Sequence, residues 1–354
     1  MRSISLSINR GGEMSDLISV AVLAGVSRAT AARAFSDPHL LKPGTLKKVL
    51  EASEQLGFRP NHIARQLRTQ SSTTLGVLLP SLSNPVFALQ LQAMEQQARL
   101  AGYGLLVATT DYQPEREAAI IEHMLRQRVA GMVLTVSDAD SSSVLAPLAE
   151  ARMPFVLAHN VPQQQNWRCV YVDNRRAMAE ATAHLIALGH QHIVMAAGPM
   201  LQSDRARQRY LGYCDAMQQA GFVPRALIDM PSHTQSRFEP LLPLINSPDP
   251  LTAVICSNDL LAISLLGAAA RAGIQVPHQL SVMGFDGIAI GEQLSPSLAS
   301  VVQPSDRLGA CAIDMLLQPS HDDSCLLDHW LRSGESIAAV FHSSTSGNHH
   351  VYTQ

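Results

Sequence analysis

The sequence lacks the features that mark several large protein classes. Its nearest candidate for a long apolar run, residues 260–270, contains Ser264 and Gly267 and falls short of the ~18 apolar residues that a membrane helix needs. The first residues carry Arg10 where a signal peptide has its apolar core, and no small-residue cleavage pattern follows. We therefore expect neither a membrane span nor secretion.

Cysteine is scarce as well. The chain has five cysteines, an odd number, which lie far apart and mostly inside apolar runs. This pattern favours reduced core thiols over a disulfide framework or a zinc site, so we expect a cytoplasmic protein with no metal and no cofactor. The five are Cys169, Cys214, Cys256, Cys311 and Cys325.

Charged residues are few and unevenly placed. They make up 16% of the 354 residues, against 46% apolar residues, which predicts a compact globular protein of two or three domains. Residues 1–74 hold 10 Lys and Arg against 5 Asp and Glu, whereas residues 75–354 hold 16 against 24. All three lysines, Lys42, Lys47 and Lys48, lie in the basic part. An anionic partner is therefore expected to bind the N-terminal part.

The first 13 residues are interpreted separately. Gly11, Gly12 and Glu13 directly precede Met14, and a purine-rich ribosome-binding stretch would encode these residues. We therefore expect residues 1–13 to be an extension that does not belong to the natural protein.

Residues 14–59 show the pattern of three short helices. Apolar residues between 17 and 24 share one face, and the pattern stops at Gly25. Ser27 is placed to cap a second helix over 28–35, and a third helix begins at Pro43 and ends before Gly57. The inward-facing residues are expected to be Leu17, Val20, Ala21, Ala24, Ala31, Ala34, Phe35, Leu46, Val49, Leu50 and Leu56.

The outer face of the second helix indicates DNA binding. Arg28 and Arg33 flank the small residues Ala29 and Ala32, so the helix can approach a surface closely while presenting two guanidinium groups. The helix, Ala-Gly-Val-Ser, helix spacing is typical of a helix-turn-helix. A three-helix bundle with no DNA partner would give the same apolar pattern, and the next segment favours the DNA-binding interpretation.

Residues 61–69 form a short helical pattern capped by Asn61, with two arginines and little apolar surface. The segment is shorter than the ~12–15 residues that an isolated helix needs in water. We expect it to fold only when a partner holds it.

The N-terminal helices and residues 61–69 resemble those of the LacI/GalR family of transcription regulators, and the resemblance continues to about residue 345. It implies that the second helix reads the major groove and that paired hinge helices of a dimer enter the minor groove, where a leucine wedges open a base step. The matching residues are Val20, Ala21, Leu23–Ser27, Ala29, Thr30, Arg33, Leu56–Asn61, Ala64, Arg65 and Leu67–Thr69.

The resemblance assigns DNA contacts by position. Arg28, Ala29 and Arg33 become the base-reading candidates, with Ser27 and Thr30 beside them, and Leu67 becomes the wedge. Backbone or minor-groove contacts are implied for Asn61, Ala64, Arg65 and Arg68. Ala34 replaces a larger apolar residue of the family, and Phe35 can restore part of that core volume.

From residue 74 short apolar runs alternate with amphipathic stretches, which predicts two α/β lobes with parallel sheets. Strands are expected over 75–80, 105–109, 132–136 and 155–158 in the first lobe and over 169–172, 192–197, 226–229, 253–257 and 281–285 in the second. Helices are expected near 85–101, 115–128, 143–152, 175–188, 205–220, 236–246 and 259–272.

Polar residues that directly follow strands are candidates for ligand binding, because two such lobes bind ligands between the carboxyl ends of their strands. His159, Asn258, Asp286 and Gln303 occupy such positions. Each has a structural alternative: Asn258 can cap the next helix, Asp286 can brace a turn with Gly287, and a single histidine is more often structural than ligand-binding.

The family resemblance places effector contacts at these four positions and adds Phe87 and Arg209. His159 stands where several family members carry an acidic residue, and a neutral or cationic group beside Arg209 favours a sugar acid or sugar phosphate as effector. The stretch Gly76–Leu82 resembles the gluconate-responsive branch of the family.

Enzyme motifs are missing: the chain has no Gly-x-Gly-x-x-Gly turn after its first strand, no phosphate-binding loop and no Gly-x-Ser-x-Gly elbow. His184, His190 and His192 are spaced so that a metal cluster is conceivable, but local hydrogen bonding is the expected role. The main competitor is a solute-binding receptor of the periplasmic kind. It would share the two-lobed body, but it would need a signal peptide and would have no use for a basic head.

The predicted fold is therefore an N-terminal three-helix helix-turn-helix domain plus hinge helix, followed by a two-lobed α/β domain like a periplasmic binding protein. We expect a dimeric repressor that binds double-stranded operator DNA and a sugar, sugar-acid or sugar-phosphate effector. The expected domains are 14–59 for DNA binding, 60–73 for the hinge and linker, 74–345 for effector binding and dimerisation, and 346–354 for a tail. Lobe one is expected to take 74–160 and 303–320, and lobe two 161–302 and 321–345.

Overall fold

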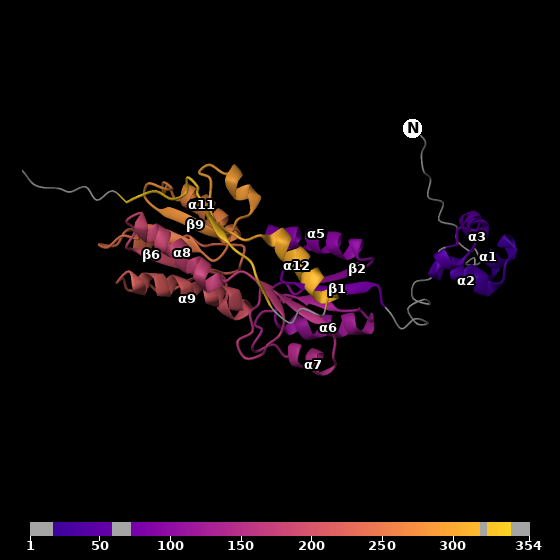
Figure 1. The fold of residues 1–354 in the computed structure, drawn as a ribbon. Helices are drawn as coiled ribbons and strands as arrows, with labels where there is room; N and C mark the ends of the chain where they lie inside the picture. The colour runs from indigo at the N-terminus through magenta and orange to yellow at the C-terminus, as the bar shows by residue number, and fades with distance from the viewer. Residues whose placement is uncertain (1–16, 59–71, 319–323, 341–354) are drawn as a thin grey trace, which may run out of the picture. The chain divides into compact units, whose positions relative to one another are not determined.

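The computed structural model describes residues 17–58, 72–318 and 324–340. The chain divides into two compact units, residues 1–71 and 72–354, which are described separately (Figure 1). No single described helix is long and apolar enough to cross a membrane; the helix pair α1 (Leu17–Ala24) and α2 (Arg28–Ser36) passes that test on length and composition, but is bent by 105°.

The first unit has the three predicted helices. Gly25 ends the first with a φ of 62°, a backbone conformation that glycine adopts without strain. The side chain of Ser27 caps the second by accepting a hydrogen bond of 3.1 Å from the backbone N–H of Thr30, as predicted. The elements are α1 (Leu17–Ala24), α2 (Arg28–Ser36), the short 3-10 helix η1 (Pro38–Leu40) and α3 (Pro43–Gln55).

The core of this unit is built mainly from small side chains, and larger residues pack around it. Phe35 stacks at a tilt on Phe58 with 5.6 Å between ring centroids, so an aromatic pair adds to the core volume, as predicted for Phe35. The prediction that Leu50 faces inward is wrong, since Leu50 is 48% exposed and Ala52 is buried instead. The 3.6-residue period explains this, because Val49 and Ala52 are three residues apart on one face.

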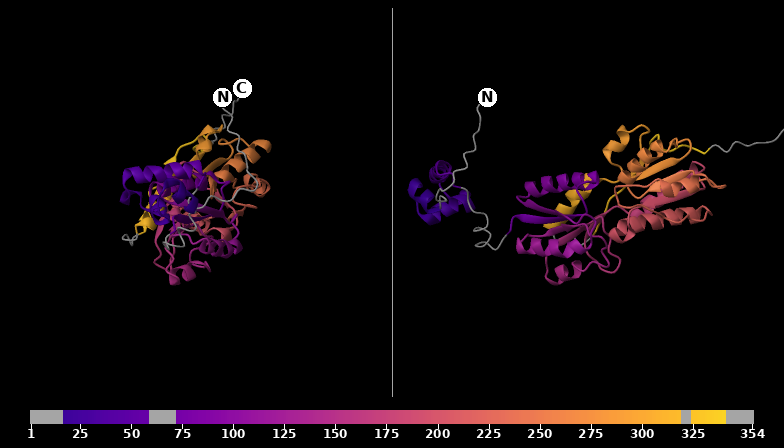
Figure 2. Two further views of the ribbon diagram at one scale, coloured as in Figure 1. Left: turned by 90° about the vertical axis from the view of Figure 1, so that its right-hand side faces the viewer. Right: turned by 180° about the vertical axis from the view of Figure 1, so that it is seen from behind.

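The second unit contains two six-stranded sheets, and helices cover both faces of each (Figures 1 and 2). The strand order is β11-β5-β4-β3-β1-β2 in the first sheet and β12-β10-β9-β8-β6-β7 in the second, and all pairings are parallel except β10 with β12. The strands are β1 (Thr74–Leu79), β2 (Gly104–Thr109), β3 (Met132–Leu134), β4 (Phe155–Ala158), β5 (Cys169–Tyr171), β6 (Ile193–Ala197), β7 (Ile228–Asp229), β8 (Ala253–Cys256), β9 (Ser281–Asp286), β10 (Ala299–Val302), β11 (Cys325–Leu326) and β12 (Trp330–Arg332).

Successive strand residues face opposite sides, and this alternation decides which helices each sheet packs against. In β1, Val77 and Leu79 pack toward α5 and α12, whereas Leu78 packs toward α6 and α7. Figures 1 and 2 show α5 and α12 side by side. In the second lobe, α8 and α9 cover one face and α11 the other. The helices are α5 (Pro85–Leu100), α6 (Glu115–Arg126), α7 (Leu145–Glu150), α8 (Asn174–Ala187), α9 (Asp204–Gln219), α10 (Leu242–Ile245), α11 (Asp259–Arg271) and α12 (Ser305–Leu317), with the 3-10 helices η2 (Met200–Gln202), η3 (Glu239–Leu241) and η4 (Ala289–Gln293).

Two strand assignments to the lobes are wrong. We expected 169–172 to open the second lobe and 321–345 to complete it, but β5 pairs with β4 and β11 pairs with β5, so these two strands belong to the first sheet. The other strand within 321–345, β12, joins the second sheet as expected. An apolar run of three residues predicts a buried strand but carries no information on which sheet it joins. The chain consequently crosses between the lobes after β5, after β10 and after β11.

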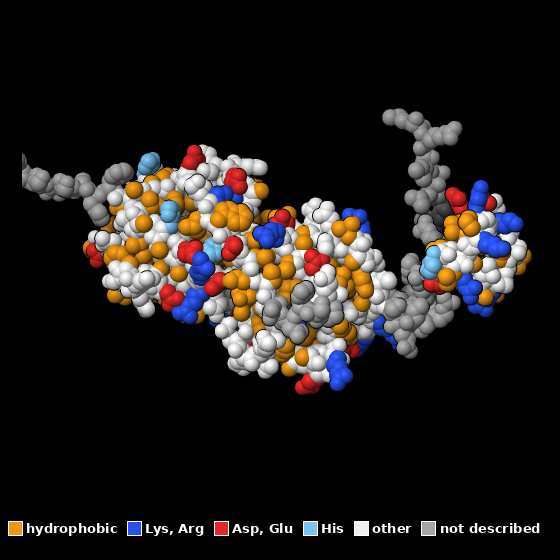
Figure 3. Space-filling view, in the orientation of Figure 1, with side chains coloured by type: hydrophobic (Ala, Val, Ile, Leu, Met, Phe, Trp, Pro, Cys, Tyr) orange, Lys and Arg blue, Asp and Glu red, His pale blue; other side chains and the backbone are white. Residues whose placement is uncertain are grey.

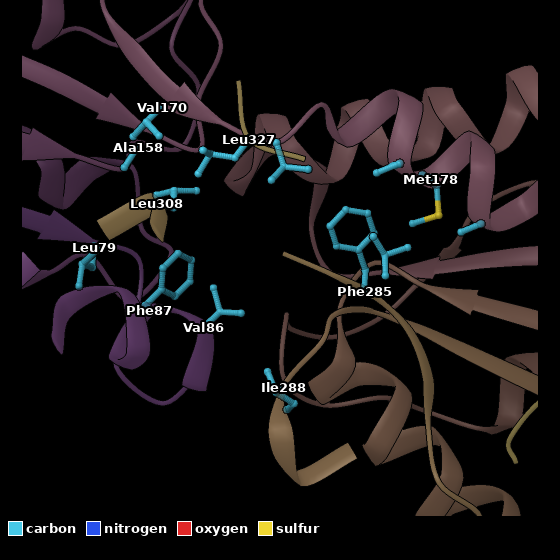
Figure 4. Close-up of a cluster of buried hydrophobic side chains, with 14 of the residues drawn as sticks. Leu79, Val86, Phe87, Ala158, Val170, Met178, Phe285, Ile288, Leu308 and Leu327 are labelled. Carbon is cyan, nitrogen blue, oxygen red and sulfur yellow. The ribbon is translucent and has the colours of Figure 1, made fainter. Parts of the chain in front are cut away.

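One cluster of buried apolar side chains runs through both lobes. Figure 4 shows Phe87 and Leu308 on the side of the first lobe, Phe285 and Met178 on the side of the second, and Leu327 of the third crossing segment between them. Because apolar burial contributes about 25 cal/mol per Å², this cluster stabilises the two lobes as one unit.

Gly309 provides a test of the helix packing. A Cβ on this α12 residue would lie 2.2 Å from the carbonyl oxygen of Gln90 in α5, so the two helices would have to separate. We expect Gly309→Ala to lower the free energy of unfolding of the second unit by roughly 2–3 kcal/mol, measured by urea denaturation. Gly267→Ala in α11 is the matched control, because the nearest atom is the end of the flexible Arg271 side chain. It should be neutral or slightly stabilising, and equal behaviour of both variants would contradict the packing described here.

Candidate functional site

A cavity lies between the two lobes at the carboxyl ends of their parallel strands. The space between its lining side chains, part of it open to solvent, has a volume of about 420 Å³. All six side chains that were predicted to bind the effector line it, and they come from different elements of both lobes. They are Phe87, His159, Arg209, Asn258, Asp286 and Gln303, and the other lining residues are Asn84, Val86, Tyr112, Ser203, Arg205, Ala206, His233 and Ser257.

Arg209 and Asp286 form a buried ion pair in this cavity. The Nη1 of Arg209 lies 3.5 Å from the Oδ1 of Asp286, and its Nε donates a hydrogen bond of 2.7 Å to Asn174. The guanidinium stacks on the ring of Phe285 at 3.6 Å and also donates to the carbonyl of Ser257. Burial lowers the pKa of Arg209 to about 10, which leaves it charged at neutral pH. The alternative that Arg209 is a solvated helix charge is therefore wrong.

Asp286 is held in place from several directions. It accepts hydrogen bonds from Gln303 at 2.8 Å and, across the lobes, from Asn84 at 3.4 Å. Its φ is 123°, a strained value for a residue with a side chain, and such strain is common at functional sites. Burial raises the pKa of Asp286, and the nearby Arg209 charge opposes this shift.

The turn that carries Asp286 rests on a second buried carboxyl group, that of Asp259. This group accepts hydrogen bonds from the backbone N–H of Ile288 at 2.8 Å and from the hydroxyl of Ser300 at 2.6 Å. Burial, with the Asp286 charge as the next cause, raises the pKa of Asp259 to about 7. Asp259 thus positions Asp286 without lining the cavity.

His159 is neutral in this site. It directly follows β4, has a φ of 70°, and its Nε2 lies 3.0 Å from the Oε1 of Gln90. Burial, followed by the charges of Arg205 and Arg209, lowers the pKa of His159 to about 3. Phe87 meets the His159 ring edge-on at 5.7 Å.

Asn258 has the structural role that was left open as an alternative. Its Oδ1 accepts from the backbone N–H of Leu261 at 2.9 Å and so caps α11. Its Nδ2 donates to the carbonyl of His233 at 2.9 Å. Asn258 therefore lines the cavity with a side chain that already has partners on both polar atoms.

Sequence reasoning missed four notable lining residues: Asn84, Tyr112, Arg205 and His233. Tyr112 of the first lobe stacks on His233 of the second, with 4.4 Å between ring centroids. Asn84 could have been found, because it precedes Pro85 at a helix start. Tyr112 and His233 lie in loops with no periodic pattern, so only the fold brings them together.

The first turn of α9 forms hydrogen bonds and an ion pair with the first lobe beside the cavity. The carboxylate of Asp204 accepts from the side chain of Asn160 at 2.7 Å and from the backbone N–H of Ala139 at 3.2 Å. The Nη1 of Arg205 donates to the carbonyl of Val136 at 2.8 Å, and Arg207 pairs with Asp138. These contacts join the two lobes beside the cavity.

The neutral state of His159 predicts an acid-sensitive stability. The unfolded chain takes up a proton at this residue near pH 6.5, whereas the folded chain resists protonation until about pH 3. Since the unfolded state binds more protons in that window, stability falls as the pH drops through it. Relative to His159→Gln, the parent chain should lose about 1.4 kcal/mol of stability per pH unit between about pH 6 and about pH 4, in denaturation series at stepped pH. Parallel curves for the two proteins would contradict a neutral buried His159.

The DNA-binding candidates of the first unit lie together on α2 and its cap. Arg28, Ala29 and Arg33 are exposed, as is Ser27, and the hydroxyl of Thr30 lies 2.8 Å from that of Ser27. The three lysines are exposed around α3, and Figure 3 shows Lys and Arg side chains across the visible face of this unit. The hinge candidates Asn61, Ala64, Arg65, Leu67 and Arg68 lie outside the described residues.

Two histidines of the spaced set bond locally. The ring nitrogens of His190 lie 2.9 Å from the hydroxyl of Thr252 and 3.0 Å from the carbonyl of Ala338. The Nδ1 of His192 lies 3.0 Å from the guanidinium of Arg225. Both rings thus serve packing and hydrogen bonding in the second lobe.

Comparison with known families matches both units. Residues 16–61 match the family of bacterial regulatory proteins of the lacI type, and residues 72–327 match the family of periplasmic binding proteins and sugar-binding domains of the LacI family. The chain belongs to the LacI family. The match over residues 16–61 favours a regulator over a solute-binding receptor, because it covers the head that such a receptor does not need.

Relatives of this LacI-family chain are transcription regulators. It is 32% identical to the HTH-type transcriptional regulator GntR of Escherichia coli (strain K12) over 84% of the chain and 89% of the relative. It is 30% identical to catabolite control protein A of Priestia megaterium over 84% of the chain and 90% of the relative. Among solved structures, the lac repressor dimer bound to operator and the anti-inducer ONPF superposes with a TM-score of 0.83 at 26% identity, covering 92% of this chain and 100% of that one.

Proposed function

We propose that this LacI-family chain is a dimeric repressor whose affinity for operator DNA is set by a small polar effector in the cavity between the lobes. The observation that carries the proposal is the combination of two sites in one chain. One is a helix with two exposed arginines, and the other is a cavity lined by a buried Arg209–Asp286 pair. The lac repressor structure, a dimer on operator DNA, supports the dimer and the DNA partner by similarity.

The cavity lining supports a polyhydroxylated effector such as a sugar or sugar derivative. Asp286 can accept hydrogen bonds from hydroxyl groups, and Arg209 offers a planar set of donors. Phe87 and Tyr112 supply aromatic surface for the carbon atoms of a sugar. We assign no catalytic step to the chain, and we place its action in the cytoplasm, where operator DNA lies in a bacterium.

The coupling between the two sites would run through residues 60–73, which join the units. An effector that contacts both lobes would change the contacts between the first turn of α9 and the first lobe. The conformation of the first lobe, which follows the linker in the chain, would change with them. The hinge segments, which we expect to be too short for stable isolated helices, would then lose the helical structure that they adopt on DNA.

DNA binding is tested with operator sites selected from a random duplex library. Fluorescence anisotropy of the full chain on the selected duplex should show tight binding that falls steeply with salt, because phosphate contacts release counterions. A dimer should select a palindromic site with two matching halves. Failure to select any sequence, with sugar binding intact, would favour the receptor alternative.

A further inference from the structure

Two arginines of α9 face the cavity one helical turn apart. Arg205 is 6% exposed and Arg209 is 7% exposed, so both guanidinium groups are removed from bulk water. Among the described residues that line the cavity, only one carboxylate, that of Asp286, stands against these two positive charges. The lining therefore carries one positive charge in excess.

The two arginines differ in how they are neutralised. Arg209 has Asp286 beside it inside the cavity. Arg205 pairs with Asp204 at 3.2 Å, but Asp204 lies outside this lining, and its other oxygen is engaged by Asn160 and Ala139. Arg205 also borders a second cavity of about 730 Å³ on the side of Asp204. The carboxylate that balances Arg205 thus lies on the side away from the effector cavity.

Two histidines in the cavity, one from each lobe, have lowered pKa values. Besides burial, Arg205 and then Arg209 lower the pKa of His159 on the first lobe and of His233 on the second, to about 3 and about 4. Both rings are consequently neutral at physiological pH. Permanent positive charge in the cavity comes from the arginines alone, and a bound anion would meet no titrating histidine.

The same cavity holds buried polar atoms without a hydrogen-bond partner among the described residues. They are Nε2 of His233, Oγ of Ser257 and Oε1 of Gln303, and each of these side chains is more than nine-tenths buried. Leaving such groups unpaired is unfavourable, and a ligand with hydroxyl groups would supply the missing hydrogen bonds. The cavity therefore matches a polyhydroxylated molecule with one negative charge.

We propose that Arg205 is the specificity-determining residue of this site and that the effector carries an oxyanion, a carboxylate or a phosphate, on a polyhydroxylated carbon chain. This inference rests on the proposed function. Bidentate hydrogen bonds from a guanidinium to an oxyanion are strong and directional. In a buried site, water competes less for these hydrogen-bonding groups. Arg209 and Asp286 then bind the hydroxyl groups, while Arg205 selects acids over neutral sugars.

The experiment compares matched probes by calorimetry on the full chain: D-gluconate against D-glucose, D-glucose 6-phosphate against D-glucose, and inorganic phosphate alone. We expect at least one anionic probe to bind at least tenfold more tightly than its neutral partner. Arg205→Gln should reduce that preference by about 10- to 100-fold, since hydrogen bonds to charged groups contribute about 1.5–3 kcal/mol. Arg126→Gln on α6, where Arg126 pairs with Glu122 at the surface, is the matched control and should keep the preference.

The outcomes distinguish a carboxylate ligand from a phosphate ligand, and failure of this inference from failure of the proposed function. Preference for gluconate assigns a carboxylate, and preference for glucose 6-phosphate assigns a phosphate. Arg205→Lys, which keeps the charge but loses the planar fork, should retain part of the preference if Arg205→Gln does not fold. Tighter binding of D-glucose than of both acids, an unchanged preference in Arg205→Gln, or no binding of any anionic probe would overturn the inference. A neutral sugar that releases operator DNA would leave the proposed function intact, whereas absence of operator binding would contradict that function itself.

Discussion

Arg209→Ala is expected to leave operator binding intact and to weaken effector binding by about 100-fold. The side chain belongs to the second unit, whereas the arginines of α2 belong to the first, and it supplies charge-assisted hydrogen bonds in a buried cavity. Such bonds contribute about 1.5–3 kcal/mol each. The measurement is an effector titration of the operator complex by fluorescence anisotropy, in which the variant should stay bound at effector levels that release the parent.

One stability measurement and one further variant serve as controls for this prediction. Arg209→Ala leaves Asp286 buried without its cation, which can itself destabilise the second unit, so thermal unfolding must be measured alongside. Arg209→Lys keeps the charge but not the planar donor set and should give an intermediate loss. If Arg209→Ala is folded and releases DNA at the same effector concentration as the parent, the assignment of the cavity is wrong.

Replacing both Arg28 and Arg33 with alanine is expected to abolish recognition of the selected operator while preserving weak binding to any duplex. Both side chains are exposed on α2 beside the small Ala29. A bidentate contact to a base is worth about 1–3 kcal/mol, so two lost contacts correspond to about 100-fold or more in specific affinity. The ratio of specific to non-specific affinity, from competition anisotropy, should fall accordingly.

Lys48→Ala on α3 is the matched comparison for this pair. Lys48 is exposed, and we assign it to phosphate. Its removal should weaken binding to all sequences alike and reduce the salt dependence by the contribution of about one phosphate contact. If the double arginine variant instead behaves like Lys48→Ala, α2 does not read bases.

The positions of the effector candidates were predictable because parallel strands end at one edge. His159, Asp286 and Gln303 each follow an apolar run, and that pattern alone places them near a cleft. Ser27 was predictable as a cap for a similar local reason, since its hydroxyl serves the next turn of the chain. Local patterns thus account for α2 and for most of the cavity edge.

Contacts between distant segments were not predictable in this way. Arg205 is one of three arginines on α9, and nothing in its spacing predicts that it is buried against Val136. The stacking of Tyr112 on His233 joins two loops of different lobes. The placement of β5 in the first sheet depends on pairing with β4, which an apolar run does not specify. These features follow from the tertiary fold alone.

Thermodynamic linkage between the cavity and the operator shows whether a ligand in the cavity controls DNA binding. Operator affinity is measured by anisotropy with and without a saturating cavity ligand found by the calorimetric panel, and ligand affinity is measured with and without operator. We expect the ligand to change operator affinity and the operator to change ligand affinity by the same factor, within the range of about 5–150-fold that is usual for allosteric coupling. A ligand that saturates the cavity and leaves operator affinity unchanged would show that the cavity does not control DNA binding.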